Sequence, residues 1–200
     1  MLQKGRILMR KVLLFFGLVL LCSAIMFADL LMPVVKAPMI VTTLGQSPGA
    51  LMFRLVCVRS KIACVQEDLL TASQLREKFQ APNGPKTLVI TTGTSLKGMG
   101  AAGIDINAEV KRVEDLMKEA KALGMTIIGA HIEGMARRVD ATDERSIVTV
   151  MPKSDLILVI AASDEDGYFA KFSEESGIPL LKVNESLDIG PALLELINAE

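Results

Sequence analysis

The 200-residue sequence is poor in the residues on which disulfide frameworks and metal sites depend, with three cysteines and one histidine. Cys22 falls in an N-terminal apolar run, which leaves Cys57 and Cys64, each flanked by apolar residues. Two cysteines do not form a framework, so two buried thiols are the favoured interpretation, with a Cys57–Cys64 disulfide as the alternative outside the cell. The single histidine disfavours a metal site.

The chain beyond residue 37 also lacks an excess of positive charge. The first 37 residues hold five Lys plus Arg and one acid, whereas the remainder holds 17 Lys plus Arg and 22 Asp plus Glu. A mildly acidic domain is not a general nucleic-acid binder, so no nucleic acid is expected as a partner. The sequence also lacks internal repeats and low-complexity tracts, and residues 38–200 are predicted to form a single domain.

A long apolar run is present near the N-terminus. Four basic residues, ending at Lys11, precede 17 uncharged residues from Val12 to Ala28. This arrangement is typical of an export signal, and its apolar helix is slightly shorter than the roughly 20 residues that span a bilayer. Residues 1–37 are therefore a cleaved signal peptide or an uncleaved anchor that holds the membrane through residues 12–32, with a short linker. Either way, the domain is predicted to be extracytoplasmic, secreted or anchored to the cell membrane.

After Pro38 the chain alternates short β-branched runs with longer amphipathic ones. Runs such as residues 88–92 and 156–160 show little polar alternation, as expected for parallel strands covered on both faces. The prediction is a three-layer αβα domain, flavodoxin-like or Rossmann-like, with strand order 2-1-3-4-5 and a sixth strand beside the fifth. The alternative order is 3-2-1-4-5-6. The predicted strands are 39–44, 62–66, 87–92, 126–132, 156–161 and 180–183, and the clearest helices are 107–124, 140–152, 165–175 and 189–199.

Residues 45–49, GQSPG, match the G-x-S-x-G pattern of serine hydrolases. In that fold the residue after the serine gives a backbone N–H to the oxyanion hole, and here that residue is Pro48, which has none. The structural alternative makes Ser47 an N-cap and Pro48 the first residue of a helix. The sequence therefore favours a structural Ser47, whose loss would lower the free energy of unfolding by about 0.5–2 kcal/mol.

Residues 98–103, GMGAAG, match the G-x-G-x-x-G pattern of dinucleotide-binding folds. In those folds the helix starts within the motif, whereas here helical periodicity resumes only near Asn107. The next strand ends about thirty residues beyond the motif, well past the roughly twenty expected for a ribose-binding acid. The pattern therefore favours a mobile glycine-rich loop, and no cofactor is expected.

Hydroxyls, glycines and cations follow the predicted strands. Ligands of open parallel sheets bind outside the carboxyl ends of the strands, where helix N-termini and cations can hold a carboxylate or phosphate. The alternative for each residue is a local role, with hydroxyls capping helices and Arg137 and Arg138 paired with Asp140, Asp143 or Glu144. The predicted ligand-binding residues are Gln46, Ser47, Thr94, Ser95, Lys97, Gly98, Gly100, His131, Glu133, Arg137 and Asp164.

Three functions follow from this edge of the sheet. The favoured one is a noncatalytic domain that binds a small anionic or polar solute. His131 and Glu133 lie two residues apart at a strand end, where Asp164 would complete a proton relay or a metal site. A hydrolase or transferase that uses Lys97, His131 and Glu133 is therefore the alternative. The third function is an interaction module with no small ligand.

Four segments in this order carry a family resemblance: GQSPGA at 45–50, TTGTSLKGMGAAGID at 91–105, HIEGMARR at 131–138 and DEDGYF at 164–169. Over residues 38–198 the chain resembles a family of small exported bacterial proteins known as a domain of unknown function. The resemblance implies an extracytoplasmic, Rossmann-like or flavodoxin-like domain, and it implies no activity, substrate or catalytic residue. An acid usually stands in this family where the chain has Gly49, which implies that the G-x-S-x-G match is accidental.

Overall fold

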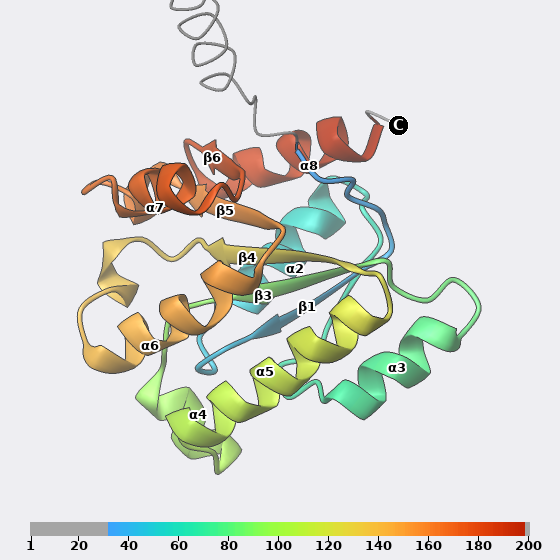
Figure 1. The fold of residues 1–200 in the computed structure, drawn as a ribbon, viewed down its shortest axis with the longest axis horizontal. Helices are drawn as coiled ribbons and strands as arrows, with labels where there is room; N and C mark the ends of the chain where they lie inside the picture. Colours follow the sequence, from blue (N-terminus) through green and yellow to red (C-terminus); the bar gives the residue numbers. More distant parts are fainter. Residues whose placement is uncertain (1–31, 199–200) are drawn as a thin grey trace, which may run out of the picture. The chain divides into compact units, whose positions relative to one another are not determined.

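A computed structural model describes residues 32–198 of the chain, so most of the predicted signal or anchor segment, residues 1–37, lies outside the described part. Six parallel strands form one sheet in the order β2-β1-β3-β4-β5-β6 (Figure 1). The predicted strand order is confirmed, and the alternative 3-2-1-4-5-6 is wrong. The strands are β1 (Met39–Thr43), β2 (Cys64–Gln66), β3 (Thr87–Thr91), β4 (Thr126–His131), β5 (Leu156–Ile160) and β6 (Leu180–Val183).

Seven α-helices lie between and after the strands within residues 32–198. Four of them, α5 to α8, agree closely with the predicted ranges. None of the helices in this part of the chain has the length and apolar character needed to cross a membrane. The helices are α2 (Gly49–Arg59), α3 (Ala72–Gln80), α4 (Leu96–Ala102), α5 (Ile106–Ala122), α6 (Ala141–Val150), α7 (Tyr168–Ser176) and α8 (Ile189–Asn198).

Helix α3 was not predicted, because it is short and has few apolar residues, with Leu75 and Phe79 one turn apart. Leu75 is its one buried residue. Its start is instead defined by a capping box, in which the Thr71 hydroxyl accepts from the Gln74 backbone N–H and the Gln74 side chain accepts from the Thr71 N–H. Local capping, which apolar periodicity does not detect, therefore marks this helix.

The helices cover both faces of the sheet, which confirms the three-layer αβα architecture (Figure 1). Helices α2 and α8 pack on one face, and α3, α5, α6 and α7 pack on the other. Successive residues of β1 alternate between the layers, with Val41 in the α2 cluster and Ile40 in the α5 cluster. β3 and β5 are buried at every position, which explains why their sequences show little polar alternation.

Cys57 and Cys64 are free thiols that lie between α2 and the sheet edge. Cys57 is buried, and Cys64 is half-buried and packs against the same core cluster. A hydrogen bond with the Cys64 thiol, together with burial, raises the pKa of Cys57 well above its ordinary value. Cys57 is therefore held in the protonated thiol form at neutral pH.

Candidate functional site

Two loops meet at the carboxyl edge of the sheet, one between β1 and α2 and the other between β3 and α4. An isolated bridge joins Gln46 to Thr94, and the Ser95 N–H donates to the Gly45 carbonyl at 2.8 Å. Gly45 has a φ of +107°, and a Cβ at this position would lie 2.5 Å from the Thr94 methyl group. The loops are neighbours, as the strand order predicts. Because hydrogen bonds join them, the two loops form one continuous surface along this edge.

Ser47 does not cap helix α2, so the prediction of an N-cap serine is wrong. The helix begins at Gly49, and Pro48 takes the N-cap position with helical backbone angles and no side-chain cap. Ser47 therefore lies one residue too early to reach the first free amides. Its hydroxyl is buried and lies 3.5 Å from the Thr43 hydroxyl.

Replacing Ser47 with Ala is expected to change the free energy of unfolding by less than about 0.5 kcal/mol, because no capping bond is lost. Ser95→Ala is the matched comparison, since the Ser95 hydroxyl does cap α4 by accepting from the Gly98 N–H at 3.0 Å. That variant should lose about 1 kcal/mol. Urea denaturation measures both, and equal losses would show that Ser47 has a structural role that its contacts do not account for.

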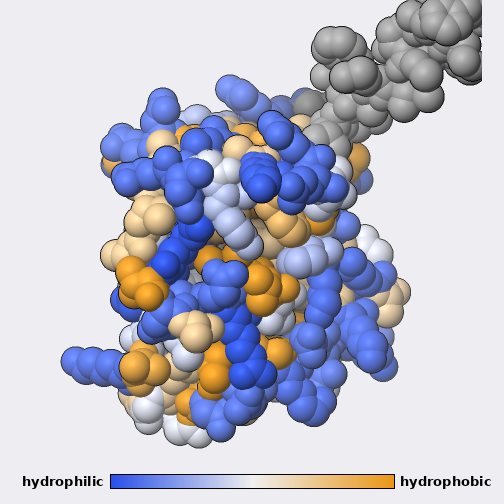
Figure 2. Space-filling model, turned by 60° about the vertical axis from the view of Figure 1, so that its left-hand side comes forward, coloured by the Kyte–Doolittle hydropathy of each residue, from blue (hydrophilic) through white to orange (hydrophobic). Residues whose placement is uncertain are grey.

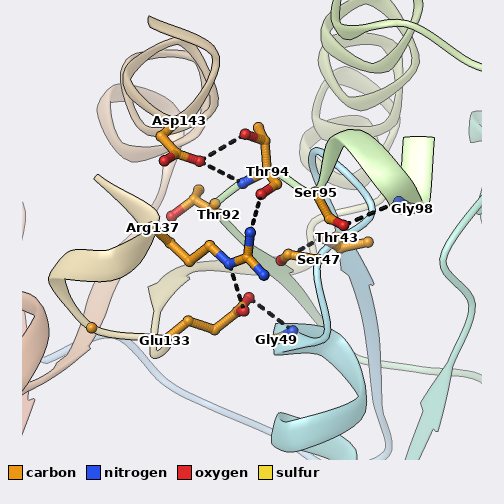
Figure 3. Close-up of polar contacts among 12 residues, drawn as sticks. Thr43, Ser47, Gly49, Thr92, Thr94, Ser95, Gly98, Glu133, Arg137 and Asp143 are labelled. Atoms are coloured by element: carbon orange, nitrogen blue, oxygen red, sulfur yellow. Dashed lines mark hydrogen bonds and ion pairs between the residues drawn. The ribbon is translucent and has the colours of Figure 1, made fainter. Parts of the chain in front are cut away.

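Glu133 supplies the cap that Ser47 does not (Figure 3). Its Oε1 accepts from the Gly49 N–H at 2.9 Å, and its Oε2 lies 3.3 Å from Nε of Arg137. The side chain is only 6% exposed. A carboxylate at a helix N-terminus is stabilised by the free amides and the helix dipole. Gly49 makes this approach feasible, because a Cβ there would lie 2.8 Å from Oε1.

Arg137 is at the centre of the cluster. It ends the short 3-10 helix η1 (Met135–Arg137), and its Nη1 donates to the Thr94 carbonyl at 2.6 Å. Its side chain crosses Gly93, where a Cβ would lie 2.9 Å from the Arg137 Cβ. Nη2 points toward Ser47 and has no hydrogen-bond partner among residues 32–198 (Figure 3). The Arg137 side chain is 33% exposed. Its guanidinium is therefore fixed by two nitrogens and can offer the third, Nη2, to a ligand.

His131 is fully buried and is part of the core rather than of the open edge. Its Nε2 lies 3.3 Å from the Gly134 carbonyl, which can only accept, so we assign the proton to Nε2. Nδ1 then accepts from the Thr92 hydroxyl at 2.9 Å. The ring also packs against Phe169, with centroids 5.4 Å apart. Burial lowers the pKa of His131 to about 4.

Asp164 is likewise engaged within the fold. It is buried, accepts from the Phe169 N–H at 2.7 Å and pairs with Lys182 at 2.8 Å. It therefore has partners different from those of His131 and Glu133. In the part of the chain that the structure describes, no three His, Cys, Asp or Glu side chains are grouped to hold a metal ion.

The stretch GMGAAG forms helix α4, so the prediction of a loop is wrong. The Ser95 cap starts this helix, and Gly103, with a φ of +65°, ends it. Gly98 allows close packing, because a Cβ there would overlap the carbonyl oxygen of Gln46, whereas Gly100 faces open space. Lys97 is exposed and has no ion pair or hydrogen bond within residues 32–198.

Glu109 and Arg112 of α5 support the β1–α2 loop, and the sequence analysis missed both. Glu109 is fully buried and accepts from the Gly45 N–H at 2.9 Å, from the Gln46 side-chain amide at 3.1 Å and from Arg112 Nε at 2.8 Å. Arg112 also donates to the Thr43 carbonyl at 2.6 Å. A Glu and an Arg three residues apart resemble an ordinary surface pair of a helix, so no sequence signal identified them.

The sequence analysis also missed Asp143, which supports the β3–α4 loop. It is buried in the first turn of α6, and its Oδ1 accepts from the Thr94 N–H at 2.8 Å and from the Thr94 hydroxyl at 2.7 Å (Figure 3).

Arg138 does not pair with Asp143, Asp140 or Glu144. It makes a two-pronged pair with Asp166, at 2.7 and 2.9 Å, and its guanidinium lies over the ring of Tyr168. Arg138 is therefore turned away from the Glu133–Arg137 cluster.

Three hollows of about 290, 440 and 390 Å³ lie away from this edge. They follow the outer side of α5, next to α3 or to the 3-10 helix η2 (Met151–Lys153). Their walls combine charged side chains such as Lys118 and Arg76 with small residues such as Ala72 and Ser73. None of the three is lined by a predicted ligand-binding residue.

The family of the chain follows from comparison with known proteins. No curated protein matches the sequence. A family model described as "Domain of unknown function (DUF6305)" matches residues 36–197, which is nearly the whole α/β domain. The chain therefore belongs to the DUF6305 family, in agreement with the resemblance carried by its four segments.

Proposed function

We propose that this is an extracytoplasmic domain that binds a small anionic or polar solute at the carboxyl edge of its sheet. The proposal rests on the hydrogen bonding of the Arg137 guanidinium. Two of its nitrogens are fixed by Thr94 and Glu133, while Nη2 is directed toward Ser47 (Figure 3). A guanidinium that is already immobilised loses little side-chain entropy when it binds a carboxylate or phosphate oxygen.

The surroundings of Arg137 favour a solute of low charge. The Glu133 carboxylate already compensates Arg137, and the exposed Lys97 on α4 is the other cation of the predicted site. The same edge carries the exposed apolar residues Leu96 and Val139. Figure 2 shows apolar patches among hydrophilic residues on this side of the molecule. A solute with one anionic or polar group and an apolar portion fits this combination.

An extracytoplasmic location is supported by the sequence ahead of the domain. Basic residues followed by the uncharged run from Val12 to Ala28 are typical of a segment that enters a membrane with its N-terminus inside the cell. The domain would then meet solutes outside the cytoplasmic membrane.

A hydrolase or transferase that uses Lys97, His131 and Glu133 has less support. A general base must reach the proton that it abstracts, and both ring nitrogens of His131 are engaged inside the core. Glu133 is directed at the start of α2 rather than at His131. The third function, an interaction module without a small ligand, is tested by the same binding measurements.

Arg137→Ala is expected to weaken solute binding by about 1 to 3 kcal/mol, or roughly 5- to 150-fold, because it removes a charge-assisted hydrogen bond. A thermal-shift screen with phosphate, sulfate and small mono- and dicarboxylates identifies the solute, since specific binding raises the melting temperature. Calorimetric titration of that solute into wild type and variant then gives the two affinities.

Lys118→Ala is the matched control, because Lys118 is an exposed cation on the outer side of α5. It should leave the affinity unchanged. Lys97→Ala should reduce affinity if Lys97 swings over the bound solute. Equal losses at all three positions would indicate diffuse attraction without a site, and the absence of binding by any probe would favour the interaction module.

A further inference from the structure

Helix α2 is apolar on its outer side as well as on its core side. Ala50, Phe53, Val56 and Cys57 are buried against the sheet. The opposite side carries Leu51, Leu55 and Val58, which are 43%, 54% and 56% exposed. Their spacing of four and three residues places them along one stripe. A surface helix normally presents polar residues outward, so this stripe indicates a surface that is covered in use.

Helix α2 carries only positive charge beside this stripe. Between Asp29 and Glu67 the sequence contains no acid, although it contains four basic residues, Lys36, Arg54, Arg59 and Lys61. Arg54 and Arg59 are exposed on α2 and have no ion-pair partner within residues 32–198. The domain as a whole has more acids than bases, so the charge of α2 is opposite in sign to that of the domain. Apolar residues flanked by unpaired arginines match the chemistry of an anionic lipid surface.

Few residues separate the predicted export segment from the core of the domain in the sequence. Val35 is fully buried in the core cluster that also contains Val56 of α2. Only six residues, 29–34, separate Val35 from Ala28, the last residue of the uncharged run. Six residues span at most about 20 Å even when fully extended. If the run is an uncleaved anchor, Val35 is tethered within about that distance of the bilayer, which keeps α2 near the membrane surface.

We propose that the outer face of α2, formed by Leu51, Leu55 and Val58 with Arg54 and Arg59, lies against an anionic membrane surface. This inference rests on the proposed membrane anchor. The leucines and the valine enter the boundary between headgroups and acyl chains, while the arginines bind lipid phosphates. The patch is too small to hold a free protein on a membrane, but a short tether keeps its effective concentration at the surface high.

Photocrosslinking in the full chain tests the contact. A benzophenone amino acid replaces Leu55, or Val148 on α6 as a control with similar exposure, 54% against 47%. Each protein is reconstituted into vesicles of phosphatidylcholine and phosphatidylglycerol, irradiated, and analysed by mass spectrometry for lipid adducts. The probe at position 55 should form lipid adducts in clear excess over the probe at position 148. Replacing both Arg54 and Arg59 with Gln should lower the yield at position 55 roughly 30-fold, since each basic residue near such a surface adds about 1 kcal/mol.

Two controls make the outcome decisive. Replacing Lys118 and Lys121 on α5 with Gln removes the same charge elsewhere and should not change the yield at position 55. Flotation of the vesicles first shows whether the full chain is anchored. A chain that does not float overturns the anchor and this inference together. A chain that floats but gives equal lipid adducts at positions 55 and 148, or only protein adducts at position 55, overturns this inference alone.

Discussion

Replacing Glu109 with Ala is expected to lower the free energy of unfolding by about 3–5 kcal/mol, the range typical of breaking a buried ion pair from one side. The Glu109 side chain is fully buried and that of Arg112 is only 9% exposed, so the variant leaves a poorly solvated guanidinium without its counterion. It also removes the acceptor of the Gly45 N–H and of the Gln46 side chain. The first loop of the candidate site thus depends on this carboxylate.

Urea denaturation followed by circular dichroism measures the loss, with Asp115→Ala as the matched control on the same helix. Asp115 pairs with Lys111, but both side chains are exposed, at 51% and 77%, so that variant should lose much less stability than Glu109→Ala. Glu109→Gln keeps the shape and the acceptor for Gly45, but it removes the charge and turns an amide NH2 group toward Arg112 Nε. It provides a comparison without a cavity if the Ala variant is too unstable. Equal small losses at positions 109 and 115 would contradict a buried pair.

The fold was predictable because the composition of the strands identifies them in the sequence. β3 and β5 are runs of apolar and β-branched residues, and strands of that composition are covered on both faces only in a parallel sheet with helices above and below. Helix α5 was equally clear, because Val113, Leu116, Met117 and Ala120 repeat at helical spacing and are all buried. Apolar periodicity failed where it was weak, at α3 and α4, whose starts depend on the hydroxyls of Thr71 and Ser95.

Of the Glu133–Arg137 cluster, only its place at the carboxyl edge of the sheet could be predicted. The rule that ligands bind beyond the carboxyl ends of parallel strands, together with glycines and hydroxyls in the loops, pointed to the correct edge for the Glu133–Arg137 cluster. Which residues face one another depends on contacts between distant parts of the chain. Glu133 reaches Gly49 across 84 positions, and Glu109 reaches Gly45 across 64. A single sequence contains no local pattern for such contacts.

His131 illustrates the converse case, in which the position of a residue in the sequence suggests a functional role that its contacts do not support. It lies at a strand end, two residues before Glu133, and the sequence analysis listed it as a ligand-binding residue and, in the alternative function, as a catalytic one. The structure surrounds the ring with Thr92, Gly134 and Phe169, so its chemistry is that of a core residue. Its burial instead makes the stability of the fold sensitive to pH.

The free energy of unfolding is expected to fall by about 3 kcal/mol between pH 7.5 and pH 4 through His131 alone. Burial lowers the pKa of this histidine from 6.5 to about 4, despite the hydrogen bond to the Gly134 carbonyl. Between these two values the unfolded chain binds a proton at His131 and the folded chain does not. Acidification therefore favours the unfolded state. The contribution is complete above pH 6.5 and is lost as the pH falls toward 4.

Urea denaturation at intervals from pH 7.5 to pH 4.5 measures the effect as a difference between wild type and His131→Gln. Glutamine does not titrate, and its amide nitrogen can still donate to the Gly134 carbonyl. The variant should be less stable at neutral pH because its side chain fits the ring cavity poorly. Its stability should nevertheless fall less steeply between pH 6.5 and pH 4.5, since carboxylates with lowered pKa values, such as Asp140 and Asp166, titrate below this window. Parallel curves for the two proteins would mean that His131 takes up its proton in the folded state, and that the core around Phe169 opens to solvent more readily than its contacts indicate.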